Sequence, residues 1–581
     1  MGPKVLAGGS KARPAGLVLF AAMSLVALSG GVAMASPIPV TTFTPKLKLV
    51  GTVNLSELAS PNSATSPSTT AGDMGAASGT SFRAVDNQVI QYGTKARANG
   101  ALMPSATTPS TTVSDENVPG ESGFVGITGY DQALANGNLD LEPPDQGLCA
   151  GGGYVGEFIN NAFSVYQPDG AHLLPVIPSY ELFKQPSSDF FSDPRCHYDA
   201  ATQRWFLQEF IVGSGNSPSL EFIAVSNTSD PTGTYTVWSI NTTDKNTAGC
   251  PCFGDYDEFG ADANGIYITT DEFSSAGSAY NGVIIYAISK ELLETYANTG
   301  IPPVPVAYRL TSDAFGQPYI VSPTSTPPGA AFAPDTEYFV ESNGNAFSDD
   351  HLIVYALRDT SLLAQPGVPP MYRTEVASEG YSFPPDATQE AGPIPLGKSV
   401  GDPEGQIQAD FDSVMQTTYT GGHVYAELDS GTSSGTDEAA WFILTPHAGN
   451  ALTATVANQG YVDVPGENLI YPAIGVDSAG DGYMTFALSG PDYFPSAAYT
   501  AFGPTGASGP VRIAQPGADP EDGFTCYAAF VGPNYGGCRW GDYSAAVAVG
   551  RTIYMGTEMI PPTSRDYLTN WGTYLWSAPA P

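Results

Sequence analysis

The chain has 581 residues, and its 65 Gly, 50 Pro and 14% charged residues indicate a large, turn-rich all-β protein rather than a helical one. Its 21 Lys and Arg stand against 58 Asp and Glu, a formal net charge of -37, which disfavours nucleic acid and anionic membrane surfaces as partners. Self-repulsion of such a chain would fall at acidic pH, where many carboxylates are neutral, so we expect a medium that is acidic or rich in salt or calcium.

The N-terminus carries the features of a secretory signal. Three basic residues precede an apolar run over residues 15–28, and residues 33–35 form an A-x-A cleavage site. We therefore predict a signal peptide over residues 1–35 and a secreted, extracellular protein, free or held at the cell surface, with no membrane span after cleavage. An uncleaved membrane anchor is the alternative, although the apolar run is short for a full span.

Residues 36–118 are dominated by Ser, Thr, Pro and Ala. Such a composition buries too little apolar surface to offset the entropy of ordering, so it predicts a flexible, disordered segment. Two strand-like islands, at 46–54 and 82–92, are the parts that could pack on a folded domain. That domain is expected over residues 119–581, where the pattern changes to regular β-strands and turns.

A repeated unit stands out in this domain. Gly254-Asp255-Tyr256 leads into a short strand, a turn at 262–265 reverses the chain, and an aromatic and β-branched run returns. Gly541-Asp542-Tyr543 opens a second copy without any gap. Two antiparallel strands recurring in this way are half of a four-stranded propeller blade.

The spacing of these units predicts a β-propeller with seven blades. The expected beginnings of the inner strands are Asp145, Asp193, Asp255, a residue near 335, one within 402–410, Tyr471 and Asp542. Because the chain after Asp542 has room for only three strands, the isolated run at 123–129 is expected to supply the fourth strand and close the ring. A two-sheet sandwich or two separate β-domains is the rival architecture.

Six cysteines agree with export. They are Cys149, Cys196, Cys250, Cys252, Cys526 and Cys538. Cys526 and Cys538 bracket a Gly/Pro/Asn loop and are expected to pair. For Cys250 and Cys252, disulfides to Cys149 and Cys196 are favoured over a zinc site, because no histidine accompanies them. Six cysteines allow fifteen pairings, so the connectivity of these four stays open.

Other motifs follow one another along the same region. They are Glu142-Pro143-Pro144-Asp145, Asp193-Pro194, Ala224–Gly233 and Arg539–Ser544. These motifs resemble a group of exported bacterial β-propellers that are described as sialidase-like or BNR-repeat-like. The resemblance covers about residues 119–581; it implies the propeller fold and transfers no activity.

The sialidase-like description implies three arginines on the substrate carboxylate, a tyrosine nucleophile with a glutamate partner and an aspartate acid/base. Arg195 and Arg539 lie near the beginnings of predicted blades and could be two of these arginines, but the sequence offers no convincing third. The strict Ser-x-Asp-x-Gly-x-x-Trp box is also missing. Sialic acid is therefore disfavoured as a substrate.

The first strand of each blade lines the channel of a propeller, so residues that begin successive blades converge at one end of its axis. A ring of carboxylates is expected there. The candidates for acid, base or nucleophile in glycoside hydrolysis are Asp193, Asp255 and Asp542. The candidates for substrate binding are Arg195, Arg539 and Asp145. Such carboxylates can also hold calcium, the one cofactor we consider, and its ligands are not assignable.

A structural role competes with these chemical ones. An aspartate before a strand often accepts hydrogen bonds from backbone N–H groups, and a repeated one can fix each blade to its neighbour. Asp271 and Glu558, at the ends of second strands, are expected to be solvated or to brace blades rather than to catalyse.

The sequence as a whole predicts a propeller that recognises an extracellular polymer. Carbohydrate is the leading class, with glycoside hydrolysis at the axial carboxylates as the chemistry to test. The alternative is a non-catalytic surface or adhesion module that contacts proteins. The expected partner is thus an extracellular glycan or protein.

Overall fold

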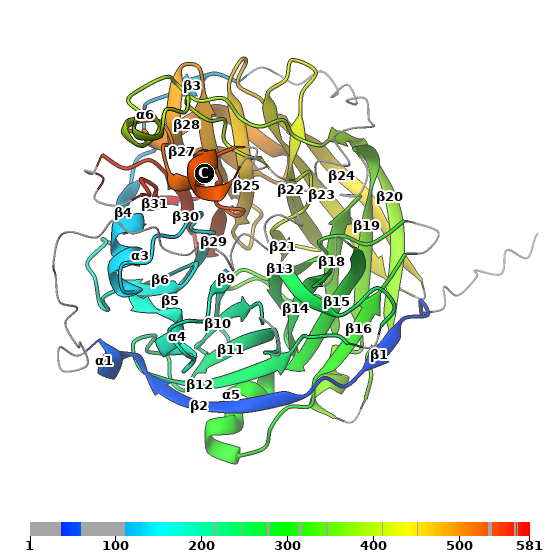
Figure 1. The fold of residues 1–581 in the computed structure, drawn as a ribbon. Helices are drawn as coiled ribbons and strands as arrows, with labels where there is room; N and C mark the ends of the chain where they lie inside the picture. Colours follow the sequence, from blue (N-terminus) through cyan, green and yellow to red (C-terminus); the bar gives the residue numbers. More distant parts are fainter. Residues whose placement is uncertain are drawn as a thin grey trace, which may run out of the picture. The chain divides into compact units, whose positions relative to one another are not determined.

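The computed structural model describes residues 37–59 and 111–581, apart from 214–216, 246, 276–278, 313–315, 344–346, 366, 410, 450, 533–536, 563–564 and 566–567. The predicted signal peptide and the expected strand at 82–92 lie outside these residues. The described part is built almost entirely of β-strands, as the turn-rich composition predicts (Figure 1).

The strands follow one another in groups that we interpret as blades. The first two groups are β5 (Gly147–Gly151), β6 (Tyr154–Ile159), β7 (Ala162–Tyr166) and β8 (Ile177–Pro178), then β9 (Phe191–Asp199), β10 (Arg204–Ile211), β11 (Leu220–Ser226) and β12 (Thr234–Asn241). The third and fourth are β13 (Cys252–Ala261), β14 (Gly265–Ser274), β15 (Tyr280–Ser289) and β16 (Val306–Leu310), then β17 (Ser322–Ser325), β18 (Thr336–Ser342), β19 (Ser348–Arg358) and β20 (Met371–Ser382).

The second half of the chain repeats this order. The fifth and sixth groups are β21 (Thr417–Thr420), β22 (His423–Gly431), β23 (Asp437–Ala448) and β24 (Leu452–Val462), then β25 (Asn468–Val476), β26 (Gly482–Gly490), β27 (Tyr493–Gly503) and β28 (Gly506–Gln515). The last group is β29 (Ala545–Val549), β30 (Thr552–Met559) and β31 (Gly572–Pro579), joined by β4 (Ser122–Thr128).

The inner strands of these groups form a closed cycle. Among the described residues, β5, β9, β13, β17, β21, β25 and β29 each contact the next, and β29 contacts β5. Parallel pairing of β13 with β17 and of β17 with β21 joins three groups into one hydrogen-bonded sheet. This cyclic order makes the protein an all-β propeller, as the repeated sequence units predict.

The N-terminal strand β4 closes the cycle, as the run at 123–129 predicts. It pairs antiparallel with β31, the last strand of the chain, with Gly123 opposite Trp576. A Cβ atom at Gly123 would lie 2.6 Å from the Trp576 Cβ, so only glycine fits this register. The pairing removes two free sheet edges at once.

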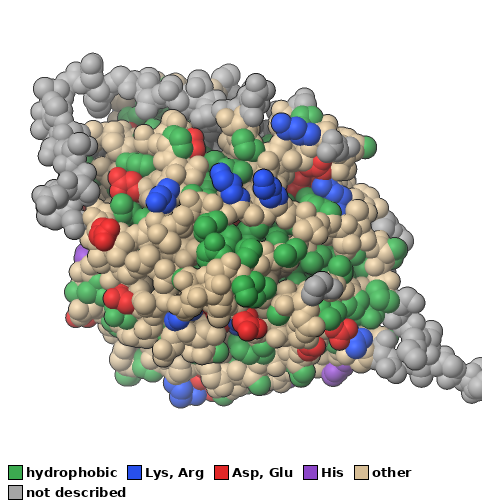
Figure 2. All heavy atoms as spheres, turned by 90° about the horizontal axis from the view of Figure 1, so that it is seen from below, with side chains coloured by type: hydrophobic (Ala, Val, Ile, Leu, Met, Phe, Trp, Pro, Cys, Tyr) green, Lys and Arg blue, Asp and Glu red, His purple; other side chains and the backbone are tan. Residues whose placement is uncertain are grey.

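The segment 36–118 contributes three strands within its described residues. Strands β1 (Thr41–Phe43), β2 (Leu47–Asn54) and β3 (Val113–Ser114) add to the outer strands β16, β12 and β28. The expected island at 46–54 is therefore β2, which is anchored because Val53 is buried in the core between the first two groups. The β1 and β2 strands cover outer edges on the face seen in Figure 2, where hydrophobic side chains gather near the centre.

Helices are short and lie in the connections. They are α1 (Leu55–Leu58), α3 (Gly129–Ala135), α4 (Ser179–Leu182), α5 (Lys290–Thr299), α6 (Pro395–Val400) and α7 (Ala528–Val531). None of the helices in the described residues is long and apolar enough to cross a membrane.

The cysteines pair as three disulfides. Cys526 bonds to Cys538, as expected. Cys149 bonds to Cys196 and so joins the neighbouring inner strands β5 and β9. The prediction that Cys250 and Cys252 bond to these two was wrong: they bond to each other across Pro251. The physical reason is that Cys149 and Cys196 already face one another on adjacent inner strands, with Cα atoms 5.2 Å apart.

Candidate functional site

Three of the predicted aspartates meet where the inner strands begin: Asp145, Asp193 and Asp542. The fourth, Asp255, lies near the beginning of β13, opposite Asp271 of β14. The exposed fractions of Asp145, Asp193, Asp255 and Asp542 are only 2%, 4%, 5% and 3%. The Asp542 N–H donates to Asp145 Oδ1 at 2.8 Å, and the Tyr543 hydroxyl donates to Asp193 Oδ2 at 3.1 Å. We call this end of the channel, which these aspartates mark, the closed end.

Asn160, the residue after β6, ties two of these aspartates together. Its Nδ2 donates to Asp145 Oδ2 at 2.5 Å, and its Oδ1 accepts the Asp193 N–H at 2.9 Å. Asp145 and Asp193 have φ angles of 49° and 54°, in the left-handed region that is costly for a residue other than glycine. The hydrogen bonds therefore hold a strained backbone and join the first two blades.

The same kind of brace recurs around the cycle. Asp271 Oδ1, at the end of β14, accepts the Ile320 N–H of the next blade at 3.1 Å. Asp429 Oδ1, in β22, likewise accepts the Tyr471 N–H at 2.9 Å. Glu558 Oε2 accepts the Gly541 N–H of its own blade at 2.6 Å. These contacts agree with the bracing role expected for Asp271 and Glu558.

The two predicted arginines reach different places. Arg539 is buried, and its Nη2 lies 3.1 Å from Asp542 Oδ2 inside the closed end. Arg195 extends further along the channel: its Nη2 lies 2.7 Å from Glu258 Oε1, and its Cζ lies 3.5 Å from the centre of the Tyr543 ring. Glu258 was not singled out in the sequence, yet it is the partner that places Arg195.

Burial raises the pKa values of several carboxyl groups at the closed end and beside it. It raises the pKa of Asp145 to about 7, with the charge of Asp193 adding to the rise and Arg539 opposing it. Burial also raises the pKa of Asp193, against the opposing effects of hydrogen bonds and of Arg195. It raises the pKa of Glu258 to about 8, although Arg195 opposes the rise. Asp145 can therefore keep a proton near neutral pH.

Aromatic side chains fill the closed end. Residues of this cluster come from the beginnings of inner strands and from the segments between blades; they include Phe253, Tyr256, Phe273, Tyr280, Tyr319, Phe383, Phe411 and Tyr543. The ring of Phe411 meets the Tyr256 ring edge-on at 5.1 Å. This packing, together with the covering loops, keeps the aspartates from solvent.

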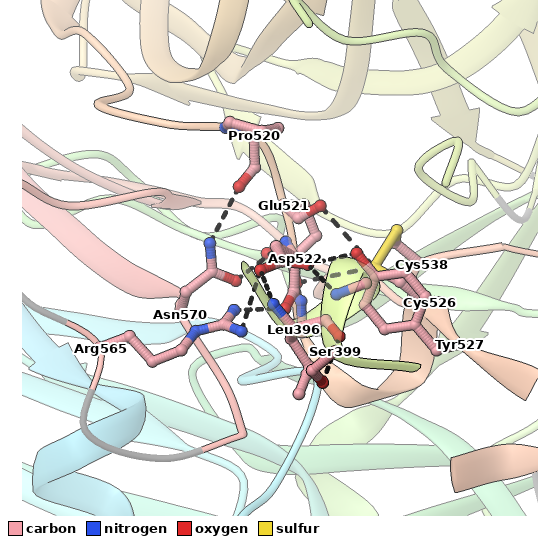
Figure 3. Close-up of polar contacts among 12 residues, drawn as sticks. Leu396, Ser399, Pro520, Glu521, Asp522, Cys526, Tyr527, Cys538, Arg565 and Asn570 are labelled. Atoms are coloured by element: carbon pink, nitrogen blue, oxygen red, sulfur yellow. Dashed lines mark hydrogen bonds and ion pairs between the residues drawn. A yellow bond between two sulfur atoms is a disulfide. The ribbon is translucent and has the colours of Figure 1, made fainter. Parts of the chain in front are cut away.

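The covering loops are held together by Asp522 (Figure 3). Its carboxylate accepts the N–H groups of Leu396 and Gly397 at 2.9 and 3.0 Å and the Arg565 Nη1 at 3.0 Å. Its own N–H donates to Asn570 Oδ1 at 3.0 Å. One residue thus fastens three loops, and the Cys526–Cys538 disulfide lies beside it.

A cavity of about 110 Å³, which we call the channel cavity, begins just past the closed end. Each inner strand supplies lining residues, such as Gly147, Arg195, Glu258, Ser322, Thr417, Gly475 and Ala546. Arg195 and Glu258 follow the buried aspartates along their strands and form its floor. Tyr198, Thr326 and Pro328, further along, are partly exposed and mark its mouth.

The lining of the channel cavity mixes polar and apolar groups and contains little charge. Hydroxyl and amide groups line it, and the Gln416 Nε2 donates to the Ile474 and Ala546 carbonyls at 3.0 Å each, which fixes that side chain. Burial lowers the pKa of His197 to about 4, so this lining side chain is neutral near pH 7. Of the described residues that line the cavity, Glu258 alone carries a carboxyl group.

Among the described residues, the predicted aspartates do not form a cluster of metal ligands. Within the described residues, the group that brings three ligand atoms within 4.8 Å of one another is Asp349, Asp350 and His351, at the surface in β19. Calcium at the closed end therefore stays a prediction from sequence, as do catalytic roles for Asp193, Asp255 and Asp542.

No model of a protein family matches the chain, and no curated protein matches it either. Among solved structures it is similar to an α-L-arabinanase from Cellvibrio cellulosa, at 12% identity over 55% of this chain and 96% of that one, with a TM-score of 0.26. An exo-β-1,3-galactanase from Clostridium thermocellum shows 9% identity over 78% and 96%, with a TM-score of 0.28. The endosialidase of phage phi92 shows 8% identity over 75% and 67%, with a TM-score of 0.32.

These similarities are too low to carry an argument about activity. The fold and the site together define an all-β propeller with a closed end of braced carboxylates and a channel cavity of mixed polarity that is open on the other side.

Proposed function

We propose that the protein is an extracellular propeller that recognises a carbohydrate polymer by taking one sugar unit into the channel cavity, and that it does not cleave the polymer there. The observation that supports this proposal is the cavity itself, which every inner strand lines and whose lining contains hydroxyl, amide and aromatic groups around one ion pair. Concave sites with a few convergent polar groups are the usual places for small ligands.

The size of the channel cavity suits a single sugar unit. A cavity admits a first water at about 10–15 Å³ of such volume, so 110 Å³ has room for a cluster of waters. A ligand of monosaccharide size would replace them and offer hydroxyls to the same polar groups. Because the protein has a formal net charge of -37, a neutral glycan fits better than a polyanion.

The lining chemistry also matches a sugar. The Arg195–Glu258 pair provides a donor and an acceptor at the floor. Ser325 and Thr326 add hydroxyls near the mouth, and Tyr198 presents an aromatic ring. These groups differ from blade to blade, as expected for a surface that recognises an irregular ligand.

Binding is better supported than hydrolysis. Glycoside hydrolysis uses two carboxyl groups on either side of the bond that is cleaved. Among the described residues, Glu258 alone brings a carboxyl to the channel cavity, and it is paired with Arg195. Hydrolysis at Asp193, Asp255 and Asp542 would require the closed end to open.

An extracellular setting is part of the proposal. Three disulfides fit an oxidising compartment, and they agree with the secretory signal predicted from the sequence. Attachment to a cell surface is compatible with the same observations.

A glycan array with the full-length secreted protein tests this proposal. We expect binding to a set of neutral glycans, and we expect Thr326→Trp, which places a large ring at the cavity mouth, to lower the affinity at least about tenfold. Thr299→Trp, on the exposed end of α5 and outside the cavity, is the matched control and should bind as the wild type does. Equal binding by wild type and Thr326→Trp would place recognition elsewhere.

A further inference from the structure

Two pairs of carboxyl groups in the interior are not needed for the proposed recognition. The first pair joins neighbouring blades: Glu221 lies in β11, Asp257 lies in β13, and both side chains are 0% exposed. Their carboxyls hydrogen-bond to each other, and the Gln208 Nε2 donates to Asp257 Oδ2 at 2.9 Å. Two carboxylates only accept hydrogen bonds, so this bond requires a proton on one of them.

Gln208 supplies a further donor to the first pair. Among the described residues, Asp257 Oδ1 receives no hydrogen bond from a neutral or cationic side chain. The titratable or charged groups that face the pair are Asp193 of β9, Arg195 of β9, Glu209 of β10, Asp255 of β13 and Tyr286 of β15. Arg195, the one cation among these groups, already pairs with Glu258. A shared proton therefore leaves one negative charge on the two carboxyls instead of two.

The second pair joins a covering loop to the start of the first blade. Glu142 and Glu521 are both 0% exposed, and their side chains hydrogen-bond to each other. The Thr525 N–H donates to Glu142 Oε2 at 2.9 Å, and the Gly523 N–H donates to Glu521 Oε1 at 2.6 Å. The remaining oxygen of each carboxyl, Glu142 Oε1 and Glu521 Oε2, meets no donor within the described part of the chain.

The surroundings of the second pair are also mostly acidic. The groups that face it are Asp522, Tyr527, Glu558 and Arg565. Arg565 is drawn toward Asp522, whose Oδ2 lies 3.0 Å from its Nη1 (Figure 3). At Gly523 a Cβ atom would overlap the Glu142 carboxyl, so the loop backbone packs directly on this pair.

Both pairs hold their proton into the neutral range. Burial raises the pKa of Glu221 to about 7, with the hydrogen bond from Asp257 opposing the rise. Burial, and then the charge of Glu221, raise the pKa of Asp257 well above its usual value. Burial likewise raises the pKa of Glu521 to about 7, against Arg565, and burial with the charge of Glu521 raises that of Glu142 well above its usual value.

We propose that these two carboxyl pairs are proton-dependent cross-links, one between the second and third blades and one between the 516–544 loop and the start of the first blade. The proton stabilises each junction in an acidic medium, and its loss near neutral pH loosens the junction. Of the media expected from the composition, these pairs favour the acidic one over one rich in salt or calcium. The proposal does not depend on the glycan proposal.

The direction of the effect follows from linkage. A group whose pKa is raised in the folded protein contributes stability that is complete below its unfolded value and is lost as pH rises through its folded value. For Glu521 the window runs from the ordinary 4.5 to about 7. One such carboxyl raises the unfolding equilibrium constant on the order of 70-fold between about pH 5 and about pH 8.

Urea unfolding of the full-length protein at about pH 5 and about pH 8, followed by tryptophan fluorescence, tests the proposal. We expect the wild type to lose stability at the higher pH. Asp257→Asn and Glu142→Gln each provide an amide N–H donor at every pH, so each should reduce the rise in the unfolding constant on the order of tenfold or more. Glu291→Gln, exposed on α5, is the control and should leave the rise unchanged.

Hydrogen exchange keeps the proposal testable if a variant does not fold. In the wild type, the amides of Gly523 and Thr525 should lose protection between the two pH values, after correction for intrinsic exchange, more than those of β26. A wild type that is equally or more stable at about pH 8, or variants that keep the full rise, would overturn the proposal. So would unchanged protection at Gly523 and Thr525.

Discussion

The two ends of the channel use the same inner strands in different ways. At the closed end, Asp145 and Asp193 accept hydrogen bonds from Asn160, Asp542 and Tyr543, and aromatic rings fill the space between blades. In the channel cavity, Gly475 and Thr326 leave room, and Arg195 forms an ion pair at the floor.

The comparison distinguishes residues that hold neighbouring blades together from residues that a ligand would contact. Residues that recur at the beginning of blades, such as the Asp of Gly-Asp-Tyr, are placed where each blade must meet its neighbour. Residues that face the channel cavity vary from strand to strand. A recurring carboxylate is therefore weaker evidence for chemistry than a single charged residue in an open cavity.

The largest change in unfolding free energy is expected from removing the disulfides at the two ends of the channel. Replacing Cys149 and Cys196 by Ser, which opens a link across 47 residues in the cavity wall, should cost about 4 kcal/mol of unfolding free energy. Replacing Cys526 and Cys538, which span 12 residues, should cost about 3 kcal/mol. Chemical denaturation of both double variants measures the order, and a larger cost at the closed end would contradict it.

The bracing role of the closed end predicts a slightly smaller effect for Asp145→Ala. The substitution leaves the Asp542 N–H and the Asn160 amide without their acceptor in the interior, and it should cost about 2–3 kcal/mol of unfolding free energy. Asp350→Ala, at a side chain that is 53% exposed, is the control and should stay within about 0.5 kcal/mol. A stable Asp145→Ala protein that loses ligand binding would assign Asp145 to recognition instead.

The smallest effect at neutral pH is expected for His197, which lines the channel cavity. Burial lowers the pKa of His197 from 6.5 to about 4, so its contribution to stability is present above 6.5 and is lost as pH falls through about 4. His197→Asn should leave the melting temperature near pH 7 almost unchanged and raise it relative to the wild type below about pH 5. Calorimetry at both pH values measures this, and a variant that gains nothing in acid would contradict the burial of a neutral imidazole.

Much of the fold follows from short patterns in the sequence. Gly254-Asp255-Tyr256 and its second copy mark the beginnings of inner strands, and the run at 123–129 stands alone because it pairs with the far end of the chain. The strand β2 was predicted as a weak strand-like island within the Ser/Thr/Pro/Ala-rich segment. The pairing of Cys250 with Cys252 was not predictable, because it depends on where Cys149 and Cys196 meet in three dimensions.

The site was predicted less well, for a geometric reason. Convergence of the aspartates followed from the repeat, but their burial comes from loops such as the one around Asp522, which have no repeated pattern. Glu258 was missed because an irregularity between Asp255 and Glu258 shifts the register with β14, and so simple alternation along the strand does not hold through this stretch. The only signal was a charged pair, Asp257-Glu258, inside a strand that is buried along most of its length.

A digestion and binding screen on neutral polysaccharides tests the central claim most directly. It compares the full-length wild type with Asp255→Asn, Asp542→Asn and Thr326→Trp, with calcium and with a chelator. If the closed end is scaffold and the channel cavity recognises the glycan, the wild type and the folded aspartate variants bind, Thr326→Trp does not, and no sugar is released. Sugar released by the wild type and lost in Asp255→Asn or Asp542→Asn would show that the closed end opens and catalyses, and would contradict the account.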